Sequence, residues 1–243
     1  MNSKRYARIR QVIAMRQPDL TVCLENVHKP HNISAVIRTA NAVGIPEIHA
    51  IWYQNSSKNL SAAAAGSNHW VKVKSYTIIE NAISGCKAAG MQILATHLTN
   101  KAVDFWQIDY TQLTGIILGQ ERTGISKRDL ALADHNTLIP MMGMVQSLNV
   151  SVASVLILYE AQRQRQNANN MYDSRFSQLS EEEQQKWLFV GDYPVLAAVL
   201  KHKGLPQPLI NEHGEIVASD AWWAAMQSTK VPGKKTHSGE LTT

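Results

Sequence analysis

The sequence has little cysteine and lacks any long apolar segment. Its two cysteines among 243 residues, Cys23 and Cys86, stand in apolar surroundings without the paired spacing of a metal site or a disulfide framework. We expect them to be core thiols in a reducing compartment, which favours the cytoplasm. No apolar run approaches the roughly 18 residues of a membrane-spanning helix, and no secretory signal follows the basic first residues. We therefore expect no membrane segment and no bound metal.

Several motifs of well-known sites are also missing. The chain contains no G-x-x-x-x-G-K-[ST] loop, no H-E-x-x-H, no G-x-S-x-G and no paired C-x-x-C. A G-x-G-x-x-G fingerprint is absent after the first predicted strand as well. Precedents from nucleotide-binding parallel sheets therefore do not apply directly.

The positive charge is concentrated at the N-terminus. With 44% hydrophobic and 18% charged residues the chain has the composition of a globular protein, and its formal net charge is +5. Residues 1–16 hold no acidic residue and these basic ones: Lys4, Arg5, Arg8, Arg10 and Arg16. Because the rest of the chain is nearly neutral, the asymmetry predicts a polyanionic partner, nucleic acid before a membrane surface. A basic helix that is simply solvated would explain the same pattern.

The middle of the chain alternates short β-branched runs with helical stretches. Strands are expected at residues 20–25, 47–52, 70–74, 91–97, 114–118 and 136–139. Helices are expected at residues 32–43, 57–65, 77–89, 126–133 and 147–165. Gly44 and Gly90 stand where a glycine ends a helix. The alternation predicts an α/β fold with a mostly parallel sheet and helices on both faces.

The two ends of the chain depart from this pattern. We expect a basic N-terminal helix at 1–17, the α/β core at 18–165, a helical extension at 166–230 and a disordered tail at 231–243. In the extension, Ser180 and Glu183 form a capping box, and Pro194 opens a helix that Gly204 closes.

The loop after the first strand, Asn26-Val-His-Lys-Pro-His-Asn32, leads into a helix that carries Arg38. Ligands of parallel sheets usually bind at such strand ends. Asn32 is expected to cap the helix, and His31 and Arg38 lie on nearly the same helical face. A helix start with two histidines, Lys29 and Arg38 suits a phosphate. A capped helix with a surface arginine would explain these residues as well.

Two further loops follow predicted strands. Gly119-Gln-Glu-Arg-Thr-Gly124 places Glu121 between glycines, which permit close backbone approach to a ligand. Ile139-Pro-Met-Met-Gly-Met-Val-Gln-Ser147-Leu-Asn149 brings three methionines into one loop, which can line an adaptable apolar pocket. Ser147 or Asn149 can cap the helix that follows. A simple turn, or core packing, would also account for each loop taken alone.

Taken in order, the three segments resemble the motifs of the SPOUT-class RNA ribose 2′-O-methyltransferases. The resemblance rests on Asn32 with Arg38, on Gly119-Gln-Glu121-x-x-Gly124, and on Ile139-Pro-Met through Ser147-Leu-Asn149-Val-Ser-Val-Ala, and it covers the core. The flanking segments Arg5-Tyr-Ala-Arg-Ile-Arg and Tyr159-Glu-Ala-Gln-Arg-Gln-Arg are similar to the branch of the family that modifies guanosine 18 of tRNA.

This resemblance implies methyl transfer from S-adenosylmethionine (AdoMet) to the ribose 2′-OH of guanosine 18 in the tRNA D-loop. It also implies a homodimer and a deep trefoil knot at the C-terminal end of the core, a rare topology. The catalytic residues it implies are Arg38, Asn32, Glu121 and Asn149. The AdoMet-binding residues it implies are Thr96, Gly119, Ile139, Met141, Ser147 and Leu148. The RNA-binding residues it implies are Arg8, Arg10, Arg16, His31, Arg163 and Arg165.

Physical chemistry constrains the role of the arginine. A guanidinium is effectively never deprotonated, so we expect Arg38 to stabilise the developing alkoxide and a neighbouring phosphate rather than to act as a base. The proton would leave through that phosphate, a water or His31. Glu121 is expected to orient Arg38 or its own loop. Two alternatives stay open: a sister methyltransferase acting on ribosomal RNA or another tRNA position, and a non-catalytic RNA-binding protein on the same fold.

Overall fold

The structure, a computed structural model, describes residues 3–52, 70–120, 123–169 and 179–228. The chain divides into two compact units, Ala14–Leu179 and a smaller one that joins Met1–Ile13 to Ser180–Thr243. The basic N-terminal helix therefore belongs to the same unit as the C-terminal extension, although the sequence predicts two separate regions. The helix expected at 57–65 and the tail expected at 231–243 lie outside the described residues.

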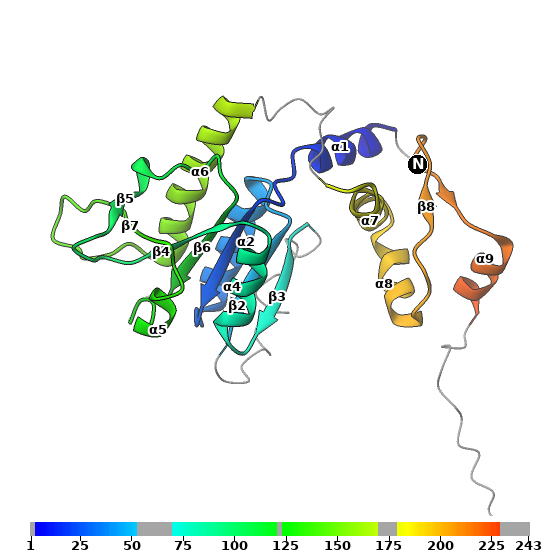
Figure 1. The fold of residues 1–243 in the computed structure, drawn as a ribbon. Helices are drawn as coiled ribbons and strands as arrows, with labels where there is room; N and C mark the ends of the chain where they lie inside the picture. Colours follow the sequence, from blue (N-terminus) through cyan, green and yellow to red (C-terminus); the bar gives the residue numbers. More distant parts are fainter. Residues whose placement is uncertain (1–2, 53–69, 121–122, 170–178, 229–243) are drawn as a thin grey trace, which may run out of the picture. The chain divides into compact units, whose positions relative to one another are not determined.

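The larger unit is built on a seven-stranded sheet whose strand pairings are all parallel (Figure 1). The strand order is β3-β2-β1-β6-β4-β7-β5. The strands are β1 (Leu20–Glu25), β2 (Glu47–Ile51), β3 (Lys72–Tyr76), β4 (Gln92–Thr96), β5 (Val103–Asp104), β6 (Thr114–Gly119) and β7 (His135–Leu138). The interior strands β1 and β6 are buried almost throughout, as expected for a sheet covered on both faces.

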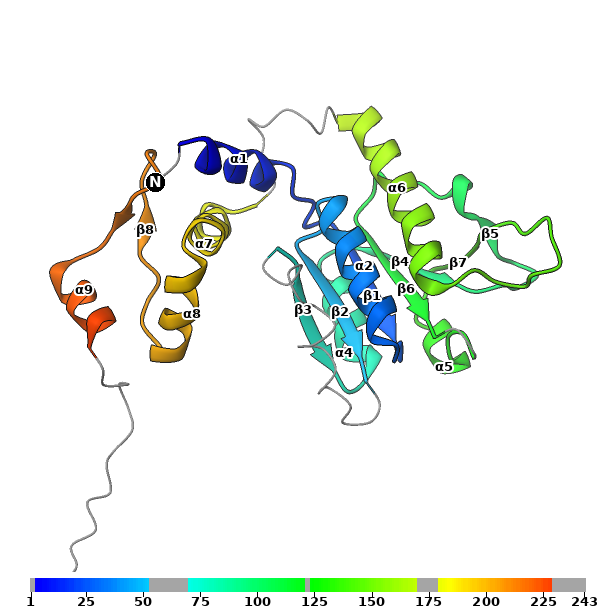
Figure 2. The ribbon, with the colours of Figure 1, turned by 180° about the vertical axis from the view of Figure 1, so that it is seen from behind.

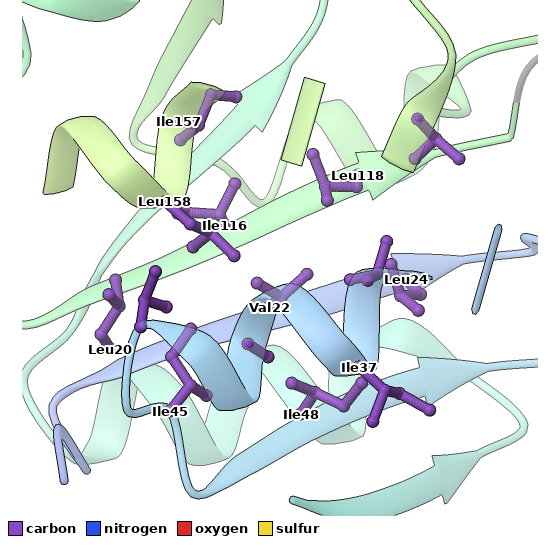
Figure 3. Packing of buried hydrophobic residues seen from close by; sticks show 14 of the residues in the cluster. Leu20, Val22, Leu24, Ile37, Ile45, Ile48, Ile116, Leu118, Ile157 and Leu158 are labelled. Carbon is purple, nitrogen blue, oxygen red and sulfur yellow. The ribbon is translucent and has the colours of Figure 1, made fainter. Parts of the chain in front are cut away.

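Helices cover both faces of this sheet. On one face, α2 (Pro30–Ala42) and α6 (Val150–Asn169) pack against each other (Figure 2). On the other lie α4 (Ile79–Ala88) and α5 (Lys127–Leu130), while the short η2 (Phe105–Gln107) follows β5. Val22 and Leu24 of β1 point into the α2–α6 side of the core (Figure 3), whereas the intervening Cys23 packs on the α4 side.

The sequence prediction of a mostly parallel α/β fold is confirmed. Each predicted strand lies within two residues of an observed one, and Gly44 and Gly90 adopt the left-handed φ of helix-ending glycines, 86° and 80°. The predicted cap of α2 is wrong. This helix begins at Pro30, with Lys29 in the cap position and no side-chain cap, because the fixed φ of proline suits the first helical residue.

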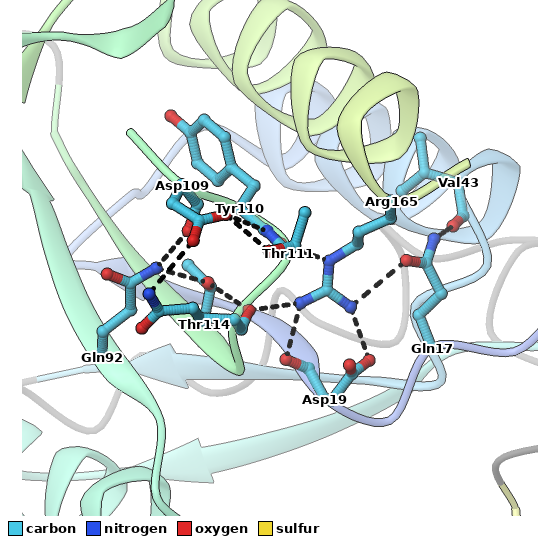
Figure 4. Close-up of polar contacts among 10 residues, drawn as sticks. Gln17, Asp19, Val43, Gln92, Asp109, Tyr110, Thr111, Thr114 and Arg165 are labelled. Atoms are coloured by element: carbon cyan, nitrogen blue, oxygen red, sulfur yellow. Dashed lines mark hydrogen bonds and ion pairs between the residues drawn. The ribbon is translucent and has the colours of Figure 1, made fainter. Parts of the chain in front are cut away.

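The buried Arg165 connects α6 to the edge of the sheet at which the strands begin (Figure 4). Arg165 is 2% exposed. Its Nε donates to the carbonyl of Tyr110 (2.7 Å), its Nη1 to Asp19 Oδ1 (2.6 Å) and its Nη2 to the carbonyl of Gln112 (2.7 Å). These acceptors offset the free-energy cost of removing the guanidinium from water, so Arg165 has a structural role.

The smaller unit is formed by short helices and one hairpin. Its elements are α1 (Ser3–Ala14), α7 (Glu181–Asp192), α8 (Pro194–Lys203), β8 (Leu209–Ile210), β9 (Ile216–Val217) and α9 (Asp220–Gln227). The side chains of α1 reach the C-terminal segment, since Arg5 Nη2 donates to the carbonyl of Gly191 (2.8 Å) and the Tyr6 hydroxyl to that of Asn211 (3.1 Å). These contacts explain why the two chain ends form one unit.

The predicted helix ends of the smaller unit are confirmed. Ser180 and Glu183 form the reciprocal capping box of α7, and α8 runs from Pro194 to a left-handed Gly204 with φ 64°. Within the described ranges, no helix of either unit combines the length and apolar character needed to cross a membrane. The same residues contain no cluster of three or more His, Cys, Asp or Glu suited to a metal ion.

Candidate active site

The segments singled out in the sequence meet at the carboxyl edge of the sheet. Because the strands are parallel, the ends of β1, β6, β4 and β7 are neighbours there. Glu25 lies opposite Gly119 in the β1–β6 pairing, and Thr96 lies opposite Thr137 in the β4–β7 pairing. The loops that follow these strands therefore leave the sheet side by side.

The turn after β6 is held tightly by its own backbone. The amide of Gly124 donates to the carbonyl of Gln120 (3.0 Å), and Gly124 has a left-handed φ of 66°. A Cβ on Gly119 would lie 2.5 Å from the carbonyl carbon of Gly124, so glycine is required at position 119. Glu121 lies outside the described residues, and its predicted role stays a prediction.

The loop of residues 139–149 contains no helix or strand and turns much of its apolar surface outward. Ile139 packs against the core, whereas Met142 and Met144 are 96% and 100% exposed. Ser147 is exposed, while Met141 and Leu148 are half-buried. The methionines at 142 and 144 therefore do not fill the core of one copy of the chain, which leaves them free to cover a ligand.

Asn149 joins the third motif to the first. Its Oδ1 accepts a hydrogen bond from the amide of Ser151 (2.8 Å), which confirms the predicted cap of α6. Its Nδ2 donates to Asn32 Oδ1 (3.3 Å). Asn32 is 2% exposed in the first turn of α2. Its side chain holds the first and third motifs together and does not cap its own helix.

His31 and Arg38 share a groove on the outer side of α2, as their spacing predicts. The groove, of about 570 Å³, lies between α2 and α6, and both side chains are exposed. The residues that line it are His31, Ser34, Ala35, Arg38, Thr39, Ala42, Val155 and Tyr159. The described residues of the 119–124 and 139–149 loops are not among them. Asn149, at the end of the 139–149 loop, nevertheless contacts the first turn of α2 through its hydrogen bond to Asn32.

The carboxyl edge also holds a buried acid. Glu25 is 4% exposed, and the amide of Ser126 donates to both of its carboxyl oxygens (3.3 Å each). Burial, together with a hydrogen bond to the Asp129 carboxyl, raises the pKa of Glu25 to about 8. The environment of Glu25 therefore favours the uncharged carboxyl over the carboxylate.

Two family models match nearly the whole described chain. The SpoU rRNA Methylase family matches residues 19–159, and the SpoU rRNA methylase C-terminal family matches residues 163–219. The chain belongs to the SpoU methylase family. The first match spans the parallel sheet, both faces of helices and the three motifs of this SpoU methylase.

Named relatives and solved structures agree with this assignment. The SpoU methylase described here is 61% identical to the tRNA (guanosine(18)-2′-O)-methyltransferase of Escherichia coli strain K12, over 94% of this chain and 99% of that one. It is 40% identical to the Aquifex aeolicus TrmH/SpoU tRNA modifying enzyme, with a TM-score of 0.70 over 79% of this chain and 96% of that chain. An AdoMet-bound rRNA methyltransferase from Sinorhizobium meliloti is 31% identical, with a TM-score of 0.53 over 59% of this chain and 56% of that chain.

The six residues expected to hold AdoMet all lie at or beyond the carboxyl edge of this SpoU methylase. Thr96 ends β4 and its Oγ1 donates to the carbonyl of Ile117 in β6 (3.1 Å), while Gly119 ends β6. The other four follow β7 in the 139–149 loop: Ile139, Met141, Ser147 and Leu148. The sheet thus gathers these residues on one side of the larger unit.

Two of the residues expected to contact RNA are buried, and the prediction is wrong for them. Arg16 is 1% exposed, its Nη1 donates to the carbonyl of Ile45 (3.1 Å), and burial lowers its pKa to about 10. Arg165 is held by the network of Figure 4. Neither guanidinium is at the surface, where a phosphate would have to meet it.

The remaining cationic residues of that set are at the surface of this SpoU methylase. Arg8 and Arg10 are exposed on α1. Arg163 is exposed on α6, where its Nη2 lies 2.7 Å from Glu160 Oε1, and this carboxylate raises its pKa. Contacts of these residues with RNA stay a prediction.

The structure adds residues that the motif search does not single out. Tyr159 lines the groove beside Arg38, and Glu25 with Asp129 supports the turn after β6. The sequence carries one usable signal for Glu25, an acid at the end of the otherwise uncharged, buried strand Leu20–Glu25, where an ionised group is costly. Tyr159 has no such signal, because aromatic residues are common in the core-facing positions of helices.

Proposed function

We propose that the chain transfers a methyl group from AdoMet to the ribose 2′-OH of guanosine 18 in the D-loop of tRNA. The observation that carries this proposal is the 61% identity with the E. coli tRNA (guanosine(18)-2′-O)-methyltransferase over 99% of its length. That similarity includes the helical segments outside the sheet as well as the core. The substrate tRNA favours the cytoplasm as the compartment where the protein works.

The carboxyl edge suits a nucleoside with a short polar tail. It offers a tight glycine turn at 119–124, the half-buried apolar side chains of Met141 and Leu148, and a hydroxyl on Ser147. Nucleoside cofactors are held by such loops at the carboxyl ends of parallel strands. When bound, AdoMet supplies an electrophilic methyl group on a sulfonium that is already a good leaving group. Thr96, Gly119, Ile139, Met141, Ser147 and Leu148 are the residues proposed to hold it.

The protein's own task is to align the ribose oxygen and to manage one proton. Alignment of reacting groups lowers a barrier by about 7–11 kcal/mol in favourable cases. We assign to Arg38 the stabilisation of negative charge on the ribose oxygen and on an adjacent phosphate, since its guanidinium cannot accept a proton. His31 shares the groove with Arg38 and is the proposed protein group nearest to the path of the departing proton.

The two asparagines and Glu121 have supporting roles in this proposal. Asn149 and Asn32 hold the 139–149 loop against the start of α2 through their side-chain hydrogen bond. Glu121 orients Arg38 or the turn in which it stands. Arg8, Arg10 and Arg163 carry exposed positive charge that suits tRNA phosphates.

We also propose that the chain forms a homodimer and that its core contains a knot. The α2–α6 face presents exposed apolar side chains, Val152, Val155 and Leu156, next to the groove of Arg38. An apolar face with an arginine and a tyrosine beside it suits a second copy of the chain. The partner's loops would then supply the AdoMet side of the site that Arg38 faces.

Methyl transfer to separate RNA pools tests the function. The full chain is incubated with radiolabelled AdoMet and either total tRNA or total ribosomal RNA, and the modified nucleotide is mapped by nuclease digestion. Label at guanosine 18 of tRNA is the expected result. Label in ribosomal RNA or at another tRNA position would favour a sister enzyme, and RNA binding without label would favour a non-catalytic protein.

A further inference from the structure

Glu25 and Asp129 lie beneath the turn after β6, and the proposed reaction leaves them without a role. We propose that these two carboxyls share one proton and that the pair positions the described residues of the turn proposed to bind AdoMet, 119–120 and 123–126. This inference rests on the proposed function, because it assigns a purpose to the turn. Glu25 and Asp129 act through the loop, so both are positioning residues.

The geometry ties the pair to both ends of the turn. Glu25 ends β1 directly opposite Gly119, where the turn begins. At the other end, the Ser126 amide donates to both carboxyl oxygens of Glu25. Ser126 in turn caps α5, since its Oγ accepts from the amide of Asp129 (3.2 Å). One buried carboxyl thus holds the place where the turn becomes a helix.

The contact between the two acids requires a proton. Asp129 is 1% exposed, and its carboxyl is hydrogen bonded to that of Glu25. Ionised carboxylates have no donor, so a hydrogen bond between two of them exists only when one is protonated. Burial is the largest cause of the raised pKa of Glu25, and the carboxyl of Asp129 raises the pKa further. The hydrogen bond from the Ser126 amide lowers it, and the resulting pKa is about 8.

The surroundings of Glu25 include no described cation that would stabilise its charge. It is flanked in the sheet by Ile51 of β2 and Gly119 of β6, and α5 contributes Asp129 and the Ser126 amide. Among the described residues, Asp129 is the one titratable group that acts on its pKa. Glu121 and Arg122 lie outside the described residues.

The sign of the pH effect follows from the raised pKa. A carboxyl whose folded pKa lies above its usual value stabilises the folded loop fully only below that usual value, and the last of this contribution is lost as pH rises through about 8. Above that pH Glu25 carries a negative charge in a buried place, against the carboxyl of Asp129. The turn should then loosen, and AdoMet should bind more weakly.

Calorimetric titration of the full chain with AdoMet, without tRNA, tests this from pH 6.5 to 9.5. For the unaltered chain, the dissociation constant should rise above pH 8, by at most about tenfold per pH unit. In Glu25→Gln the amide can donate to Asp129 and accept from Ser126 at every pH, so its affinity should not change across the range. Asp129→Asn should flatten the profile too, because its amide can donate to an ionised Glu25.

Two further variants separate positioning from simple loss of packing. Glu25→Ala should bind AdoMet more weakly than Glu25→Gln at pH 7. Glu47→Gln alters a carboxylate where β2 begins, at the edge of the sheet opposite to Glu25. In this variant the dissociation constant for AdoMet should still rise above pH 8. If the dissociation constant of Glu25→Gln still rises above pH 8, the proposal is overturned. It is also overturned if Glu25→Gln binds AdoMet as weakly as Glu25→Ala at pH 7.

Hydrogen exchange distinguishes this failure from a failure of the proposed function. In the ligand-free chain, the protection factor of the peptide that spans 119–130 should fall as pH rises through 8, and it should not fall in Glu25→Gln. If the chain binds no AdoMet at any pH, the proposed function is wrong while this difference in protection still supports the pair. If protection is the same in both proteins, the pair does not hold the turn.

Discussion

Asn149 makes hydrogen bonds in two directions, and the two can be separated by substitution. Its Oδ1 caps α6 through the Ser151 amide, and its Nδ2 reaches Asn32. Asn149→Ala should lower the free energy of unfolding by about 0.5–2 kcal/mol because the cap is lost. Asn149→Asp keeps an acceptor for the cap but no donor for Asn32, so it should retain most of that stability and still bind AdoMet more weakly.

Urea unfolding and calorimetry on the same three proteins check this prediction. Gln146→Ala, an exposed change in the same loop, is the control for stability. Normal stability and normal AdoMet affinity in Asn149→Ala, combined with a large loss of turnover, would instead make Asn149 a catalytic residue.

The buried arginines show where sequence reasoning fails at the scale of single residues. Arg165 stands in a polar run, Gln162-Arg-Gln-Arg165, which is typical of an exposed helix end. Its acceptors, among them Asp19 and the carbonyls of Tyr110 and Gln112, come from segments far away in the sequence. No local pattern contains that information, because burial of a charge depends on partners that only the tertiary fold assembles.

Strands and helices were predictable to the extent that burial dictates local composition. β1 matches its prediction at both ends, because a strand buried on both faces must be a continuous apolar run. β5 has two residues and leaves no periodic signal. The start of α2 was misjudged because a capping asparagine competed with Pro30, and proline at the first helical position prevailed.

The turn after β6 makes a prediction at the scale of an element. In Gly119→Ala, the new Cβ would stand 2.5 Å from backbone of Gly124, which cannot move aside as a flexible side chain would. The turn must therefore open, and AdoMet binding should fall below calorimetric detection while the sheet still folds. Gly85→Ala is the matched control, since its Cβ would meet nothing within 4 Å and alanine favours helix by about 1 kcal/mol.

Circular dichroism on both variants confirms that each is folded before binding is measured. AdoMet affinity in Gly119→Ala equal to that of the unaltered chain would show that the turn tolerates a side chain and lies away from the cofactor.

At the scale of the whole molecule, the charge of the N-terminal helix should set the salt dependence of tRNA binding. Arg8 and Arg10 are exposed on α1. If each meets a phosphate, replacing either with Gln should reduce the slope of log affinity against log salt by about 1. Filter binding between about 50 and 300 mM salt measures this slope. The Debye length falls by a factor of about 2.4 across that range. A slope that is unaltered in the double variant would remove α1 from the RNA interface.

Because the described residues of the loops proposed to bind AdoMet do not line the groove of Arg38, we can test whether two copies of the chain make one site. Arg38 lines the α2–α6 groove, and none of the described residues of the 119–124 and 139–149 loops lines it. In a homodimer whose sites form across the interface, a subunit without Arg38 still offers an intact AdoMet loop to its partner. A subunit with Gly119→Ala still offers Arg38. Two inactive variants should therefore restore activity when they share a dimer.

Arg38→Ala and Gly119→Ala chains, unfolded together and refolded at equal ratio, provide this measurement. Half of the dimers are mixed and each mixed dimer has one complete site, so the expected rate is about a quarter of that of the unaltered enzyme. If Arg38 instead served the loops of its own chain, every site in the mixture would lack either the arginine or the AdoMet loop, and no activity would return. Refolding each variant alone controls for residual turnover. Recovery of methyl transfer only in the mixture would assign Arg38 to the partner's AdoMet site.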